Sequence, residues 1–146
     1  MFKILIIGLG SAGQRHLRIF KKIFFKKKLE IFCIRETKRN LIIKDNLSTK
    51  KTLSLPKFYN LKEITLDELK KFNFDLAVIS NPISKHLTSA IRLAKKKVNL
   101  LIEKPLSHNL NKIQLLNKIV KKNKILVRVG YQLRYHPGIK KLKSII

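Results

Sequence analysis

The chain has 146 residues, of which 45% are hydrophobic, so it can fill the core of one ordinary domain and is not a disordered tail. Its 34 Lys and Arg residues against 8 Asp and Glu residues give a formal charge of +26, a balance that first suggests a nucleic-acid partner. The lysines are scattered in short groups, and most phenylalanines stand in apolar runs rather than between the lysines. We therefore expect no specific nucleic-acid partner, and a basic nucleic-acid-binding module is the alternative function.

Two further features bear on where the protein works and on its redox chemistry. No run of about 18 apolar residues occurs, and the apolar start at residues 2–7 leads into glycines rather than into a cleavage site. This pattern predicts a cytoplasmic protein without a membrane partner. Cys33 is the single cysteine and stands in an apolar run, so we expect a buried strand residue and neither a disulfide nor a metal site.

Strands and helices alternate along the chain from its first residues. Short apolar runs predict strands at residues 2–7, 29–34, 74–79, 99–102 and 125–129. Helical spacing of apolar residues predicts helices at 12–25, at 84–97 with Ser84 as the cap, and from Ser107 or Asn109 to about residue 122. Repeated units of this size imply an α/β fold with a doubly wound parallel sheet, the Rossmann fold, covered on both faces.

The segment between the second and third of these strands has a weaker pattern. Residues 37–51 are polar and only weakly periodic, which predicts a weak helix followed by a loop. The Leu55-Pro56 step favours extended chain, with a short strand around residues 58–59. Thr65 stands three residues ahead of Glu68, the spacing of a capping box, and predicts a short helix over 65–71.

A Gly-x-Gly-x-x-Gly motif follows the first predicted strand and opens the first predicted helix. The first glycine permits a tight turn, the second lets the backbone approach a pyrophosphate, and the third allows the helix to pack closely on the strand. The free N–H groups and the positive dipole end of the helix also favour an anion. The predicted dinucleotide contacts at this turn are Gly8, Gly10, Ser11, Ala12 and Gly13.

The end of the second predicted strand bears on the choice between NAD and NADP. An acidic residue usually binds the adenosine ribose at this place in NAD-binding domains, and here the chain has Arg35 followed by Glu36. Arg35, with Lys38 and Arg39 close behind, favours the 2′-phosphate of NADP, whereas Glu36 can still reach the ribose hydroxyls of NAD. The sequence leans slightly to NADP.

Open parallel sheets bind ligands beyond the carboxyl ends of their strands. The polar residues at these ends form three groups: Ser80, Asn81 and Pro82 with His86; Glu103, Lys104 and Pro105; and Tyr131, Arg134 and His136. We expect the three groups to meet at one edge of the sheet. Since a residue before proline is held extended, Lys104 should direct its ammonium over this edge, toward the nicotinamide and a substrate hydroxyl.

These residues resemble the glucose-fructose oxidoreductase, inositol dehydrogenase and rhizopine-catabolism family (Gfo/Idh/MocA) over nearly the whole chain. The matching pieces are residues 8–16, Asn81-Pro82 with His86, Ala90 and Ala94, then Glu103-Lys104-Pro105, and finally residues 130–137. The resemblance implies a nicotinamide-dependent oxidoreductase acting on a sugar or sugar nucleotide. It also implies that Lys104 is catalytic, that Glu103 supports the cofactor and that His86 borders the same pocket. The turn at residues 95–97 departs from the family, in which a glycine often ends this helix.

The resemblance also implies a second, substrate-binding domain. Residues 1–131 would form the dinucleotide-binding domain, and residues 132–146 would begin the connection to a substrate domain that is missing from the chain. We therefore expect this chain to bind the dinucleotide without turning over sugar, and a non-catalytic remnant is a further alternative. Apolar side chains at the end of the chain, at Ile139, Leu142, Ile145 and Ile146, would favour self-association.

Overall fold

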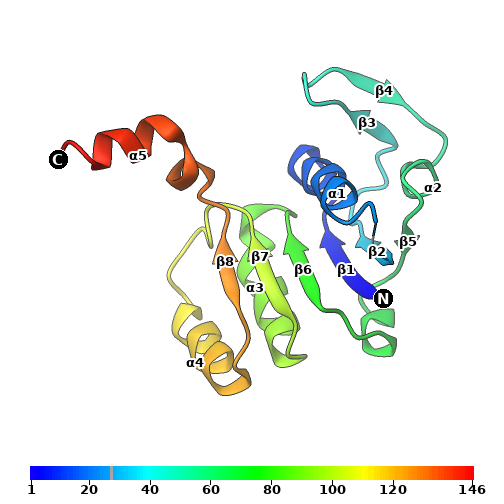
Figure 1. Cartoon of the computed structure of the whole chain (residues 1–146). Coiled ribbons are helices and arrows are strands. Elements are labelled where there is room, and N and C mark those ends of the chain that lie inside the picture. The colour runs from blue at the N-terminus through cyan, green and yellow to red at the C-terminus, as the bar shows by residue number, and fades with distance from the viewer. Residues whose placement is uncertain (27) are drawn as a thin grey trace.

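The structure of the chain, a computed structural model, describes residues 1–26 and 28–146. This part of the chain folds around a six-stranded parallel sheet with the strand order β5-β2-β1-β6-β7-β8 (Figure 1). The strands are β1 (Phe2–Ile7), β2 (Leu29–Ile34), β5 (Lys62–Glu63), β6 (Leu76–Ile79), β7 (Asn99–Ile102) and β8 (Val127–Val129). The predicted α/β fold with a doubly wound parallel sheet is thereby confirmed.

Helices cover both faces of the sheet because successive strand residues point to opposite faces and both faces are apolar. Helix α1 (Ser11–Ile23) packs through Leu17 on the face formed by Ile4 and Ile6. Helices α3 (Ile83–Lys95) and α4 (Ile113–Asn123) lie on the opposite face, where Leu5 and Ile7 join the larger core cluster (Figure 1).

The chain changes direction across the sheet at β1. From β1 it winds outward to β2 and β5, then returns to β6 and winds the other way to β7 and β8. The carboxyl ends of β1 and β6 therefore flank a topological switch point, where open α/β sheets bind their ligands. The turn after β1 and the turn after β6 are the two segments that meet there.

The weak helix predicted over residues 37–51 is wrong. This segment forms an antiparallel hairpin of β3 (Leu41–Ile43) and β4 (Thr49–Lys51), separate from the main sheet and set over α1 (Figure 1). Strands of three residues are too short to show a period of two, so the sequence pattern could not reveal them. Leu47 adopts a positive φ of 65° in the connecting turn.

The strand predicted around residues 58–59 is also wrong, because helix α2 (Leu55–Phe58) occupies this place. Pro56 stands in the first helical turn, where its missing N–H is not needed, and Ser54 Oγ accepts a hydrogen bond from the Lys57 N–H at 3.4 Å. The capping box is confirmed: the Thr65 N–H donates to Glu68 Oε2 at 2.9 Å. The helix predicted over 65–71 is shorter, because η1 (Glu68–Lys71) is a 3₁₀ turn with Asp67 at its cap position.

Two predicted helix starts need correction. Helix α3 begins at Ile83 with Pro82 rather than Ser84 at the cap position, and α4 begins at Ile113 rather than near Ser107 or Asn109. Lys112, before α4, has a left-handed φ of 64° and separates the helix from the preceding turns.

The last segment leaves the sheet. After β8, a 3₁₀ turn η2 (Gln132–Tyr135) and helix α5 (Pro137–Lys143) extend away from the rest of the fold (Figure 1). No buried residue occurs in either element, and the predicted exposed apolar side chains are confirmed: Ile139, Leu142, Ile145 and Ile146. Among the described residues, no helix combines the length and the apolar character that a membrane span needs.

Candidate functional site

The three glycines of the turn between β1 and α1 have different roles. Gly8 has a φ of +92°, and a Cβ there would lie 2.7 Å from the backbone of Ser80 and Asn81. A Cβ on Gly13 would lie 2.0 Å from the carbonyl oxygen of Gly8. A Cβ on Gly10 would meet nothing within 4 Å. Packing of the fold therefore requires Gly8 and Gly13, whereas Gly10 leaves an open approach to the backbone.

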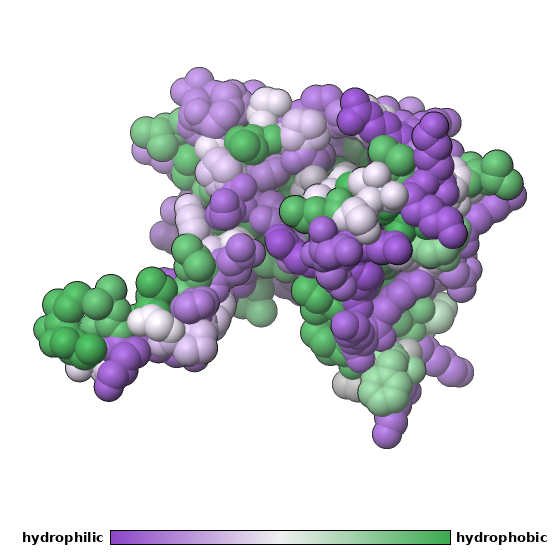
Figure 2. Space-filling view, turned by 90° about the horizontal axis from the view of Figure 1, so that it is seen from above, coloured by the Kyte–Doolittle hydropathy of each residue, from purple (hydrophilic) through white to green (hydrophobic). Residues whose placement is uncertain are grey.

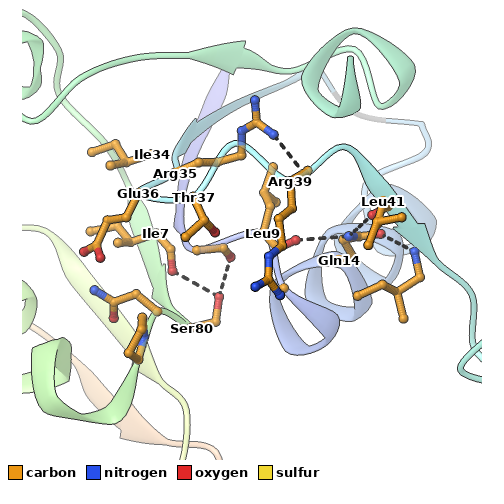
Figure 3. Close-up of a pocket in the computed structure, with 15 residues that line it drawn as sticks. Ile7, Leu9, Gln14, Ile34, Arg35, Glu36, Thr37, Arg39, Leu41 and Ser80 are labelled. Carbon is orange, nitrogen blue, oxygen red and sulfur yellow. Dashed lines mark hydrogen bonds between the residues drawn. The ribbon is translucent and has the colours of Figure 1, made fainter. Parts of the chain in front are cut away.

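Ser80 ties this turn to the end of β6. Its hydroxyl lies 2.8 Å from the carbonyl oxygen of Gly8 and 3.1 Å from that of Ile7, and its N–H donates to Ile7 O at 2.9 Å (Figure 3). The two carboxyl ends that flank the switch point are thus held together by direct hydrogen bonds. The predicted contacts Gly8, Gly10 and Ser80 lie in one place.

A cleft of about 440 Å³ opens above this turn. It is lined by the turn itself, by the end of β2, by the hairpin strand β3 and by the turn after β6 (Figure 3). The predicted residues on its wall are Gly8, Gly10, Arg35, Ser80, Asn81 and Pro82. Ser11, Ala12 and Gly13 form the first turn of α1 behind it.

The beginning of α1 suits an anionic ligand. Gly10 is the cap residue, no side chain caps the helix, and its first turn holds no acidic residue. The first N–H groups of a helix lack partners within the helix, and the helix dipole adds partial positive charge at this end. A pyrophosphate therefore fits these residues, and the missing Cβ of Gly10 gives it room.

Asn81 offers a further contact for a ligand. The residue is 9% exposed, and its Nδ2 donates to Ser89 Oγ at 3.1 Å. Its Oδ1 is buried and finds no hydrogen-bond donor among the described residues. A buried acceptor of this kind is costly unless a partner binds it. Since Asn81 lines the cleft, Oδ1 can accept from an amide or hydroxyl group of a bound cofactor.

Arg35 lies at the cleft, but its guanidinium is engaged elsewhere. Nε and Nη2 each donate at 3.0 Å to one carboxylate oxygen of Glu63, and Nη1 donates to Asn40 Oδ1 at 3.2 Å. Its side chain is only 6% exposed. The guanidinium of Arg35, which directly follows β2, therefore connects the end of this strand to Glu63 of β5 and to Asn40 in the next loop. Arg39, which also lines the cleft, has a guanidinium without a hydrogen-bond partner among the described residues.

His86 is a buried bridge between two turns and not part of the cleft wall as the structure describes it. It is 1% exposed, and its Nε2 lies 2.8 Å from Asn81 O and its Nδ1 2.9 Å from Pro105 O. The ring thus links the turn after β6 to the turn after β7. Lys104, in that second turn, is exposed and precedes a cis peptide bond to Pro105.

Glu103 connects β7 to α1. His16 Nε2 lies 2.7 Å from Glu103 Oε1, and Arg15 Nη2 donates to the same oxygen at 3.4 Å. Burial acts to raise the pKa of Glu103, but the hydrogen bond and the charge of His16, together with Arg15, lower it by more. The ionised carboxylate lines a second, more open cleft with Tyr131 and Arg134. Of the three polar groups of the sequence, Ser80, Asn81 and Pro82 thus line the first cleft, and Glu103, Tyr131 and Arg134 line the second. The walls of the two clefts, as far as the structure describes them, do not include His86, Lys104, Pro105 or His136.

Sequence reasoning missed several residues of the first cleft, among them Gln14, Leu41 and Ile43. Gln14 is completely buried on α1, three residues before the buried Leu17. A glutamine on the inward stripe of a helix is a signal that the sequence carries, since a buried amide must have hydrogen-bond partners. The two hairpin residues carry no such signal.

Comparisons with known proteins agree with this geometry. A family model described as "Oxidoreductase family, NAD-binding Rossmann fold" (GFO_IDH_MocA) matches residues 2–131. A myo-inositol 2-dehydrogenase of Thermotoga maritima is 28% identical over 144 residues, which are 99% of this chain and 40% of the relative. An oxidoreductase of Bacillus subtilis, YrbE, is 26% identical and is matched over 38% of its length.

Solved structures share the fold. The WlbA dehydrogenase of Chromobacterium violaceum, in complex with NADH and UDP-GlcNAcA, has a TM-score of 0.76 at 17% identity, over 98% of this chain and 39% of the other. The UDP-N-acetylglucosamine 3-dehydrogenase GnnA of Acidithiobacillus ferrooxidans has a TM-score of 0.74 at 21% identity, over 98% and 41%. The chain thus spans about 40% of the length of the relatives it matches. The glycine turn lies at the switch point, and the family model matches residues 2–131. The chain therefore belongs to the Gfo/Idh/MocA family of oxidoreductases and contains the NAD-binding Rossmann domain of that family.

Proposed function

We propose that the first cleft binds NAD or NADP with the pyrophosphate over Gly10 and the first turn of α1. The observation that carries this proposal is the contrast among the glycines, since Gly10 alone of the three faces open space at an uncapped helix start. The adenosine would lie between the end of β2 and the hairpin. The nicotinamide would lie toward Ser80 and Pro82, with its carboxamide or ribose in reach of Asn81 Oδ1.

We propose further that the whole protein moves hydride between a hydroxyl-bearing carbon of a sugar or sugar nucleotide and the nicotinamide. A dinucleotide bound in the cleft supplies the hydride acceptor or donor. The amine of Lys104, at the same edge of the sheet, would take or return the proton of the hydroxyl group. Glu103 and His86 support this role by fixing the two ends of the turn around Lys104. The substrates in the names of the relatives, inositol and UDP-sugars, support a polyol or sugar-nucleotide substrate.

The slight preference for NADP is part of the proposal, but we assign the contact with its 2′-phosphate to a different arginine. Arg35 has its donors on Glu63 and Asn40, so Arg39 is the better candidate to contact a 2′-phosphate. Glu36 forms an ion pair with Lys85, which lowers its repulsion of that phosphate. Isothermal titration of NAD and NADP into the chain tests both the site and this preference.

The expected result is saturable binding of at least one of the two dinucleotides. Arg39→Ala should weaken NADP about tenfold more than NAD, because an exposed charge-assisted contact is worth about 1.5 kcal/mol. Arg35→Ala should lower thermal stability and leave the ratio of the two affinities nearly unchanged. No binding of either dinucleotide would refute the assignment of the cleft, and an unmoved ratio in Arg39→Ala would refute the NADP preference.

Self-association through the last segment is a further proposal. The large apolar residues of the segment 133–146, which includes η2 and α5, are exposed by between 45% at Ile139 and 97% at Ile146. Green, hydrophobic residues gather at the far end of this projecting segment in the space-filling view (Figure 2). Light scattering should give a mass above that of one chain, and Ile139→Lys with Leu142→Lys should restore the monomer. The cytoplasmic location stays a prediction of the sequence.

A further inference from the structure

The β3–β4 hairpin forms one wall of the first cleft, although few of its own residues are buried. All of β4 is exposed, and Ile42 is the buried residue of β3. A two-stranded hairpin is marginally stable in water on its own. Something outside the hairpin must therefore hold it at a fixed distance from the glycine turn.

Side chains of α1 supply this support. Gln14 Nε2 donates to Leu41 O at 2.8 Å, and Gln14 Oε1 accepts from the Ile43 N–H at 2.8 Å (Figure 3). Arg18 Nη1 donates to Ile43 O at 2.8 Å. The backbone hydrogen bonds to β4 are made at alternate residues of this strand, since the Thr52 N–H donates to Asn40 O and the Lys44 N–H donates to Ser48 O. Leu41 O and the Ile43 N–H therefore lie on the edge of β3 that faces away from β4. The amide thus takes the place of a neighbouring strand.

The same amide also reaches the glycine turn. Gln14 Nε2 donates to Leu9 O at 3.0 Å, and Gln14 Oε1 accepts from the Tyr59 hydroxyl at 3.1 Å. The two donors and two acceptor positions of the amide are then all used, and Gln14 is 0% exposed. One buried side chain therefore connects the pyrophosphate turn to the opposite wall of the cleft.

We propose that Gln14 is a positioning residue for dinucleotide binding, which holds the hairpin as the adenosine-side wall of the cleft. Leu41 and Ile43 line the cleft, and their backbone groups are the ones that the amide binds. Losing the amide would leave buried backbone groups unpaired and free the wall to move. This proposal rests on the proposed dinucleotide function of the cleft. It adds that the adenosine half of the cleft depends on a side chain that does not need to touch the cofactor.

The test compares Gln14→Leu with the parent chain and with Gln114→Leu, the same substitution at an exposed position of α4. Calorimetric titrations use NAD, NADP, ADP and inorganic pyrophosphate as probes. We expect Gln14→Leu to weaken ADP and the dinucleotides by tenfold or more and pyrophosphate by less than threefold, with Gln114→Leu unchanged. Amide hydrogen exchange should become faster at Ile43 but not at Leu100 in the central sheet.

Three outcomes decide the matter. Equal affinities for ADP in Gln14→Leu and the parent would overturn the role of Gln14 and leave the proposed function standing. A parent chain that binds none of the dinucleotides would overturn both. If Gln14→Leu does not fold, Tyr59→Phe replaces it, since it removes one hydrogen bond of the amide without a change of size. An about threefold loss of ADP affinity at unchanged pyrophosphate affinity would then support the proposal, and unchanged ADP affinity would overturn it.

Discussion

Substitutions at Gly10 and Gly13 should separate binding from folding. Gly10→Val places a side chain where nothing lies within 4 Å, in an extended conformation (φ −73°, ψ −164°) that any residue adopts. Gly13→Ala places a single methyl group 2.0 Å from the carbonyl oxygen of Gly8. The smaller substitution should therefore damage the fold, and the larger one should damage only the binding of the cofactor.

The magnitudes follow from these distances. Ordinary contacts begin at about 3.4 Å, so Gly13→Ala forces backbone segments apart by roughly 1.4 Å. Overpacking typically costs about 1–3 kcal/mol. Because the backbone carbonyl of Gly8 cannot rotate away as a side chain could, we expect a loss of about 3 kcal/mol in the free energy of unfolding and a fall of about 10 °C in Tm. In Gly10→Val, the reduced conformational freedom of the unfolded chain stabilises the fold, and the weaker helix cap destabilises it. The two effects nearly cancel, so the free energy of unfolding should change by less than about 1 kcal/mol. Losing one N–H contact to the pyrophosphate costs about 2 kcal/mol, or about 30-fold in affinity.

Thermal unfolding and calorimetric titration of NAD and NADP check both variants. Gly130→Ala is the matched control, because its Cβ would meet its nearest neighbours at an ordinary 3.6 Å. It should change neither Tm nor affinity appreciably. Full affinity in a folded Gly10→Val would refute the placement of the pyrophosphate, and an unchanged Tm in Gly13→Ala would refute the packing argument.

Three other predictions concern buried and charged groups. Burial raises the pKa of Cys33 to about 12, so a thiol reagent at pH 8 should label it only after unfolding; fast labelling of the native chain would contradict its burial. The folded-state pKa of Glu103 lies below the ordinary 4.5, so its carboxylate stabilises the fold above that pH, and the contribution is lost as the pH falls through the folded-state pKa. Glu103→Gln should flatten the fall of Tm below pH 4.5, and an identical acid profile would count against the His16 contact. Raising NaCl from 0.01 to 0.15 M shortens the Debye length from about 30 to about 8 Å. We expect Tm to rise, because screening weakens the repulsion within a chain of charge +26 by more than it weakens the ion pairs. A falling Tm would show that the ion pairs contribute more than the repulsion costs.

Five of the six strands of the sheet could be predicted from sequence because they are mostly apolar runs that the fold buries, whereas the edge strand β5 consists of two exposed polar residues and carries no such signal. Residues 2–7, 29–34 and 99–102 are strands with the predicted bounds. The hairpin could not be predicted, because its position depends on Gln14, a residue 27 positions away from Leu41. Likewise, Pro56 was compatible with both extended chain and a helix start, and only the tertiary contacts of the buried Leu55 decide between them.

The functional site likewise has one part that the sequence predicts and another that it does not. The glycine turn is local, so its motif and its place after a strand are enough to predict the geometry around Gly8. The partner of Arg35 is not local: Glu63 lies 28 positions ahead, and nothing in the sequence pairs the two. Glu103 and His16 are 87 positions apart. A charged residue next to a predicted site is therefore free to bind a ligand only if the fold has not already given it a partner.

Because charged residues can already have partners in the fold, the net charge of the chain is a poor guide to the charge available in the first cleft. The charged residues on the cleft wall, among those the structure describes, are Arg35, Glu36 and Arg39, which sum to a single positive charge in a chain of +26. Arg35 and Glu36 have ion-pair partners, Glu63 and Lys85. A pyrophosphate in this cleft would therefore depend on backbone N–H groups and the dipole of α1, which act at short range, and not on the lysine-rich surface. Its affinity should vary far less with salt than the charge of the chain suggests, because bulk ions screen the distant lysines and leave the short contacts nearly intact.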